Sequence, residues 1–149
     1  MTPIGDPHIG CVNYLQERLT VALVGRAIIQ VQSAIRLASD WVPQPDVAVL
    51  HRRADYYRTG TAEPGDVVLL IEVAETSAER DRDVKLPAYA RAGIPEVWLV
   101  DLSAASILVA REPGPDGFRA VVAHARRALL TVPGFADVTL AVDEILGRP

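Results

Sequence analysis

The sequence has 149 residues, half of them hydrophobic, and a formal net charge of −4. These values predict one globular domain with a real core. They exclude a disordered chain and a globally basic surface, so contact with nucleic acid would need a local arginine cluster. Cys11 is the only cysteine, which excludes a disulfide framework and a cysteine zinc cluster. We find neither a membrane-spanning segment nor a signal peptide, and therefore predict a cytoplasmic protein with no membrane association.

Periodicity predicts the elements of the first half of the chain. Asp6-Pro7 is typical of a helix start, and the apolar residues that follow recur at helical spacing. Short β-like runs come next, and then a long polar stretch. In chain order we expect a helix over 7–24, strands over 26–32, 34–38 and 47–50, and an exposed loop over 51–66.

The second half begins with the most hydrophobic run, 67–74, which predicts a central strand. A helix is expected over 78–92, with a kink or break at Pro87. Further strands are expected before a short terminal helix, over 97–100, 106–111, 118–124 and 138–142, the second and third forming a hairpin. This order of elements predicts an α+β domain with a mixed sheet.

Two carboxylates stand out in these strands. Glu72 lies within the central strand, and strand alternation places it on the same face as Leu70 and Val68. Because burying an unpaired carboxylate is costly, a metal ion, a lysine or an arginine should compensate it. Asp46 precedes another strand, where antiparallel pairing would bring it beside Glu72. Two carboxylates from adjacent strands, with backbone carbonyls and water, would form an oxygen-rich site suited to magnesium or manganese.

Lys85 is the only lysine in a chain with fourteen arginines. Arginine cannot replace an ammonium group that must act as a compact point charge. Asp81, Lys85 and Tyr89 are each four residues apart and therefore share one helix face. One interpretation is an ordinary Asp–Lys pair on the helix surface. In the other, the helix packs back over the Glu72 strand, so that Lys85 orients an attacking water and stabilises the developing phosphorane charge.

The middle of the chain also carries several motifs in a fixed order. They are Pro45-Asp46-Val47-Ala48-Val49, Ile71-Glu72-Val73-Ala74-Glu75-Thr76-Ser77, then Asp81, Lys85, Tyr89 and Gly93, and finally Ile94-Pro95-Glu96-Val97-Trp98-Leu99-Val100-Asp101. Together they resemble the Uma-two family of restriction-endonuclease-like proteins, which is similar to the PD-(D/E)XK nuclease superfamily. The resemblance covers most of the chain and is strongest from Asp46 to Asp101.

This resemblance implies a restriction-endonuclease-like fold, with a mixed β-sheet flanked by helices, in a single domain over residues 1–149. Family members generally have a further helix and strand before the segment that corresponds to residues 3–8. We therefore expect this chain to be truncated at its N-terminus relative to the family.

The resemblance also implies roles for individual residues. Asp46 and Glu72 would be the metal-binding acids, and Val73 would contribute its backbone carbonyl to a magnesium or manganese ion. In the parent superfamily the lysine lies two residues after the glutamate, but that position here is Ala74. Lys85 is therefore interpreted as the migrated equivalent of that lysine, supplied by the next helix.

Other polar residues are weaker candidates. The three histidines, His8, His51 and His124, lack zinc-ligand spacing, so we expect solvated or capping roles. His8 is the best exception, because it begins the first helix and matches a recurrent family position. Glu75 and Glu79 could join the metal site, although a helix N-terminus attracts acids for electrostatic reasons alone.

Residues outside this acidic group have simpler explanations. Trp98 is expected in the core, and Asp101 is as easily a turn former as a ligand. Six arginines are candidates for a phosphate-facing rim, although a solvated surface is the default for each: Arg52, Arg53, Arg58, Arg80, Arg82 and Arg91.

The leading hypothesis is a metal-dependent endonuclease that hydrolyses DNA phosphodiester bonds, with Asp46, Glu72 and Lys85 as its catalytic residues. DNA is the predicted substrate, and a homodimer remains open. The first alternative is a catalytically degenerate nuclease fold that acts as a binding or assembly module. The second is a small-molecule hydrolase that uses the same acids.

Overall fold

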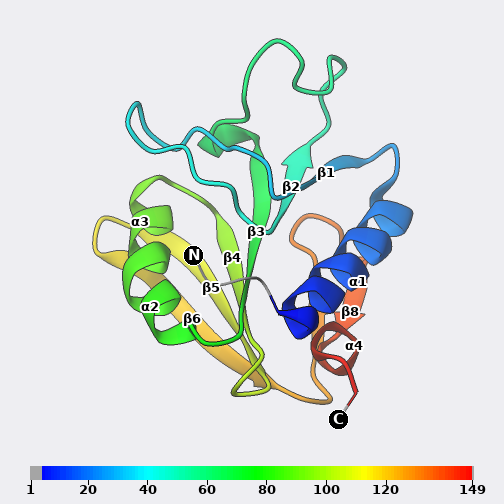
Figure 1. The fold of residues 1–149 in the computed structure, drawn as a ribbon. Coiled ribbons are helices and arrows are strands. Elements are labelled where there is room, and N and C mark those ends of the chain that lie inside the picture. The colour runs from blue at the N-terminus through cyan, green and yellow to red at the C-terminus, as the bar shows by residue number, and fades with distance from the viewer. Residues whose placement is uncertain (1–4, 149) are drawn as a thin grey trace.

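The computed structural model describes residues 5–148, and its centre is a six-stranded mixed sheet (Figure 1). The strands lie side by side in chain order: β1 (Ala27–Val31), β2 (Val47–His51), β3 (Val67–Ala74), β4 (Glu96–Asp101), β5 (Ser106–Gly114) and β6 (Gly117–Ala125). β3 and β4 are parallel, and every other neighbouring pair is antiparallel. The predicted α+β fold with a mixed sheet flanked by helices is confirmed.

Helices and connecting segments cover both faces of the sheet, and a separate hydrophobic core lies on each face. On one face, helix α1 (Asp6–Leu23) packs with the small ribbon of β7 (Leu129–Thr131) and β8 (Thr139–Ala141) and with helix α4 (Val142–Leu146). On the other face, α3 (Leu86–Arg91) packs with the segment between β1 and β2. Because both faces are covered, every residue of β3 is buried.

A β-bulge changes the faces of β3 near its start. Val49 pairs with Leu69, but Leu50 pairs with Val67, which leaves Val68 as the extra residue. Val68 consequently packs into the core beneath α1, whereas Leu70 packs into the core beneath α3. The prediction that Val68 shares a face with Leu70 and Glu72 is therefore wrong, because the bulge interrupts the alternation between them.

The helical region after β3 is not one regular helix. It consists of α2 (Ala78–Arg80), a π-helical turn at Asp81–Lys85 and α3. The Leu86 N–H donates across the wider turn to the Asp81 carbonyl. Pro87 has no N–H to continue the ordinary helical pattern, so an irregularity is expected in the turn before it. The predicted kink or break at Pro87 is therefore found as a π-helical turn just before the proline, and the helix itself continues through Pro87 in α3.

Two strand predictions need correction. Residues 34–38 do not form a strand, because their backbone partners are scattered: Ile35 bridges to Ala62, and Leu37 N–H and Ala38 N–H both donate to the Trp41 carbonyl. The apolar alternation there reflects burial of Ile35 and Leu37 in the core beneath α3. The predicted last strand exists as β8, but its partner β7 was not predicted.

The predicted central strand is present with its predicted ends as β3, and the other remaining elements are present with ends shifted by a few residues. The exposed loop over 51–66 closes with a short 3-10 turn at Pro64–Asp66. Among residues 5–148, no helix has the length and apolar character needed to cross a membrane.

Candidate functional site

The site is built where β2 begins and β3 ends. Val47 pairs with Ile71, so the next residues, Asp46 and Glu72, lie opposite one another just beyond the paired part of β2. The Asp46 carboxylate is anchored there, because its Oδ2 accepts the Val73 N–H at 2.8 Å. The structure thus brings together the two acids and the backbone of Val73, all three of which had been singled out in the sequence.

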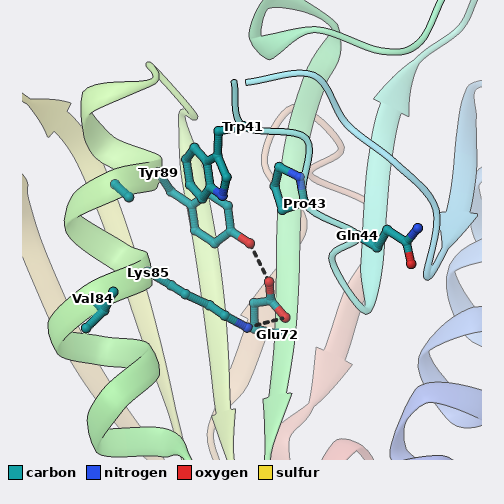
Figure 2. Close-up of a pocket in the computed structure, with 8 residues that line it drawn as sticks. Trp41, Pro43, Gln44, Glu72, Val84, Lys85 and Tyr89 are labelled. Atoms are coloured by element: carbon teal, nitrogen blue, oxygen red, sulfur yellow. Dashed lines mark hydrogen bonds and ion pairs between the residues drawn. The ribbon is translucent and has the colours of Figure 1, made fainter. Parts of the chain in front are cut away.

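Glu72 is buried against the helical region, and two side chains reach it (Figure 2). The Tyr89 hydroxyl donates to Oε1, and Lys85 Nζ lies 3.8 Å from Oε2. Burial raises the pKa of Glu72 to about 7; Lys85 and Tyr89 oppose that rise, and the negative charges of Asp46 and Asp81 add to it. The carboxylate is therefore only partly compensated by its protein partners.

Lys85 lies between two carboxylates. Its Nζ is 3.5 Å from Oδ1 of Asp81 as well as 3.8 Å from Oε2 of Glu72. Asp81 is buried and accepts a hydrogen bond from Ser77 Oγ at 3.0 Å, which fixes its position. The Lys85 side chain keeps 44% of its surface exposed, so its ammonium group is held at the sheet yet open to a ligand.

The contact of Tyr89 with Glu72 is not among the sequence predictions, which place Tyr89 only on the helix face of Lys85. The four-residue spacing between Lys85 and Tyr89 is the feature of the sequence that could have indicated this contact. Trp41 stacks on the Tyr89 ring, with centroids 5.5 Å apart and planes inclined by 26°. Burial raises the pKa of the Tyr89 phenol, and the charge of Glu72 adds to that rise, so the hydroxyl remains a donor.

His8 also belongs to the site. Its Nε2 lies 3.2 Å from Oδ1 of Asp46, and its backbone N–H donates to Oε1 of Glu75 at 2.9 Å. His8, the expected exception among the three histidines, is thus neither solvated nor a helix cap: its side chain is 12% exposed and contacts an acid that lies far away in sequence. Its Nδ1 is buried and has no hydrogen-bond partner among the described residues.

Glu75 holds the start of α1 in place. Its carboxylate accepts the His8 N–H, a favourable position for an anion at a helix N-terminus. Gly5 makes room for that carboxylate, because a Cβ at Gly5 would lie 2.5 Å from Oε1. Glu75 therefore positions His8 beside Asp46, and its carboxylate is already engaged in a hydrogen bond to the start of α1.

The six candidate arginines do not gather at this site. The loop that carries Arg52, Arg53 and Arg58 connects the far ends of β2 and β3, at the top of the sheet in Figure 1. Glu72 lies five positions after Val67 along β3, which is about 16 Å at the usual rise per residue. The prediction of one phosphate-facing rim is therefore wrong, because three of its members lie at the opposite end of the strand pair.

The other candidates have structural roles or lie elsewhere. Trp98 is fully buried in the core, as predicted. Asp101 accepts the Ala104 N–H at 3.0 Å, which makes it a turn former. His51 ends β2 at the loop end of the sheet, and His124 lies on β6.

The donor chemistry at Asp46 and Glu72 fits a hard divalent cation. Both residues offer carboxylate oxygens, and the buried, partly compensated charge of Glu72 is one that a cation would stabilise. Within residues 5–148, however, no three His, Cys, Asp or Glu side chains are already grouped as metal ligands. Binding would therefore need these carboxylates to exchange their present hydrogen-bond and ion-pair partners.

The mixed sheet therefore carries Asp46, Glu72 and Lys85 together at one end of the β2–β3 pair. The chain belongs to the Uma2 family, described as "Putative restriction endonuclease", whose model matches residues 1–143. The predicted family is thereby confirmed, and its description indicates a nuclease.

A solved structure supports the fold independently. The chain is similar to a protein from Anabaena variabilis ATCC 29413 that is described as a putative nuclease belonging to DUF820, with a TM-score of 0.68 and 17% sequence identity. The alignment covers 98% of this chain and 83% of that one. A search of curated proteins found no match.

Proposed function

We propose that this protein is a metal-dependent endonuclease that hydrolyses phosphodiester bonds in DNA. Asp46 and Glu72, with the backbone carbonyl of Val73, would hold magnesium or manganese, and Lys85 would complete the catalytic set. The observation that carries the proposal is the convergence of Lys85 on Glu72 at the strand end where Asp46 is anchored to Val73. The proposal treats residues 1–149 as one domain, and a cytoplasmic location and a homodimer remain predictions.

The carboxylates are held before any ligand arrives. Asp46 is oriented by the Val73 N–H and by His8, and Glu72 by the Tyr89 hydroxyl. A divalent ion bound there would lower the pKa of a water molecule and neutralise charge on the scissile phosphate. Fixed ligand orientations reduce the reorganisation that binding requires.

Lys85 supplies a positive charge at the solvent side of Glu72. Its exposed ammonium group can donate a hydrogen bond to the attacking water and stabilise negative charge that develops on the phosphoryl oxygens. Asp81 keeps that ammonium group near the strand without covering it. An arginine would fit poorly here, because its planar guanidinium is larger and spreads its charge over several nitrogens.

A second candidate is a catalytically degenerate nuclease fold that serves as a binding or assembly module. It is favoured by the contacts that Lys85 and Tyr89 already make with Glu72, by the Lys85–Asp81 pair, and by the absence of a three-ligand group among the described residues. In that case the charges form a structural cluster, and removing Glu72 or Lys85 should lower stability without changing any response to metal.

The two candidates are separated by manganese titration in a calorimeter, with wild type, Asp46→Asn and Glu72→Gln compared. The nuclease proposal expects binding by the wild type and a loss of at least tenfold in affinity in each variant. Arg26→Gln is the control, because Arg26 pairs with Asp137 outside the site. No manganese binding by the folded wild type would contradict the nuclease proposal.

The substrate class is tested separately with plasmid DNA and with bis(p-nitrophenyl) phosphate. A nuclease should cleave DNA in a manganese-dependent manner that Glu72→Gln abolishes. Hydrolysis of the small phosphodiester without cleavage of DNA would identify a small-molecule hydrolase and contradict the proposed substrate.

A further inference from the structure

A cavity of about 350 Å³ adjoins Glu72, and its walls are mostly apolar and aromatic. Its size is within the range of sites that take small organic groups. The segment between β1 and β2 supplies one wall and the helical region supplies the other (Figure 2). The lining residues are Trp41, Pro43, Gln44, Glu72, Val84, Lys85, Ala88 and Tyr89.

Trp41 gives this cavity a fixed aromatic wall. The indole is half-buried, and its stack on the fully buried Tyr89 ring, which lines the same cavity, holds it in place. A braced ring that still lines a cavity can stack on a flat partner with little loss of side-chain freedom. Nucleobases are such partners, and stacking on aromatic side chains is a general means of binding unpaired bases.

The charges that line the cavity do not suit binding to the phosphate backbone of duplex DNA. Lys85 is the only cation among the described residues that line it, and it is already shared between Glu72 and Asp81. Backbone recognition of duplex DNA needs several free basic side chains. Arg52 and Arg58, which could supply them, lie at the opposite end of the β2–β3 pair.

We propose that this cavity receives one unpaired nucleobase of the DNA strand whose phosphodiester lies beside Glu72 and Lys85. The inference rests on the proposed function and specifies its substrate class: single-stranded DNA, or an unpaired position within a duplex. A paired base is held in the stack and would have to be extruded before it could enter. Trp41 would stack on the base, and the Gln44 amide offers a donor and an acceptor at the cavity wall.

The test measures base binding apart from cleavage. The probe is a fluorescein-labelled oligothymidylate with uncharged methylphosphonate linkages, used single-stranded and annealed to its complement. These linkages resist hydrolysis and are not repelled by Asp46 and Glu72. Fluorescence anisotropy then gives the affinity of each form for wild type, Trp41→Ala and Val84→Trp.

Val84→Trp is chosen to block the cavity directly. Val84 is 58% exposed at the cavity, so tryptophan there would fill the cavity while leaving the Trp41–Tyr89 stack intact. It therefore keeps the test decisive if Trp41→Ala is unstable. Tyr56→Ala is the control, because Tyr56 is an exposed aromatic residue on the distant loop.

We expect the wild type to prefer the single strand and each cavity variant to bind it about tenfold more weakly, with Tyr56→Ala unchanged. No binding of the single strand, equal binding of both forms, or unchanged binding by folded Val84→Trp would overturn the inference. Single-strand binding without manganese-dependent cleavage of ordinary DNA would support the cavity but contradict the nuclease. If ordinary single-stranded and double-stranded DNA are cleaved equally, and Val84→Trp does not change this, the nuclease would be supported but the cavity assignment would be overturned.

Discussion

Lys85 Nζ lies 3.8 Å from Oε2 of Glu72, which joins the only lysine of the chain to a buried carboxylate on the central strand. The contact depends on the π-helical turn Asp81–Lys85 and on the packing of α3 over the sheet. The only lysine, the irregular turn of the helix and the buried Glu72 carboxylate therefore meet at one point of the structure. Buried carboxylates with a strongly shifted pKa cluster at functional sites, which supports the proposed role of Glu72.

The raised pKa of Glu72 predicts how stability depends on pH. Its ordinary value of 4.5 applies to the unfolded chain and a value of about 7 to the folded protein, so the folded state binds more protons between these limits. This contribution to stability is complete below pH 4.5 and is lost as the pH rises through about 7. Glu72→Gln should lack the effect.

The measurement is the melting temperature of wild type and Glu72→Gln across that interval. The wild-type value should fall relative to the variant as the pH rises, because other titrating groups are common to both proteins. A difference that stays constant with pH would show that the carboxylate titrates normally.

Tyr89→Phe should destabilise the protein through Glu72. The change removes the hydroxyl that donates to a buried carboxylate but keeps the ring on which Trp41 stacks. Leaving such a buried acceptor with fewer partners costs about 1 to 3 kcal/mol of unfolding free energy. Urea unfolding gives this value directly.

Tyr57→Phe is the matched control for that substitution. The Tyr57 hydroxyl donates to the His51 carbonyl at 2.7 Å in an exposed bond, where water can replace it. Its loss should cost about 0.5 kcal/mol or less. Equal effects of the two substitutions would mean that burial of Glu72 does not govern the energetics of the Tyr89 bond.

Gly5→Ala should disturb the start of α1. A new Cβ would meet the Glu75 carboxylate at 2.5 Å, and the carboxylate would have to leave the His8 N–H that it accepts. Loss of a helix-capping interaction costs about 1 kcal/mol. Manganese affinity should fall as well, because His8 would no longer be held beside Asp46.

Gly10→Ala tests the same chemical change inside the same helix. A Cβ at Gly10 meets no described atom within 4 Å, so the better helix propensity of alanine should stabilise α1 by about 0.5 to 1 kcal/mol. Thermal unfolding and calorimetry of both variants check the pair. Destabilisation by both substitutions would assign the effect to the helix in general, and the role of Glu75 would be lost.

Much of the site could be predicted from local patterns. A strand period placed Glu72, the Pro45-Asp46 segment preceded a second strand, and four-residue spacing linked Lys85 to Tyr89. These patterns worked because strand pairing and helix faces follow from short stretches of sequence. The family motifs added the expected fold, a mixed sheet flanked by helices.

What could not be predicted depends on contacts between distant segments. His8 reaches Asp46 only because Glu75 and Gly5 fix the start of α1, and no local spacing encodes that arrangement. The bulge at Val68 shifted one side chain to the opposite face. The misplaced arginines of the 51–66 loop are a different case: the loop joins the end of β2 to the start of β3, so the antiparallel pairing predicted from the sequence already puts it at the end away from Asp46 and Glu72.

The most direct test of the account is manganese-dependent nicking of supercoiled plasmid by wild type, Glu72→Gln, Lys85→Ala and Arg82→Ala. Arg82 is the matched control, since it lies on the same π-helical turn but pairs with the exposed Asp83. The account predicts nicking by wild type and Arg82→Ala and a loss of at least a hundredfold in folded Glu72→Gln and Lys85→Ala, as expected when an essential group of a catalytic set is removed. Nicking that persists unchanged in both site variants, or no nicking by a wild type that also fails to bind manganese, would contradict it.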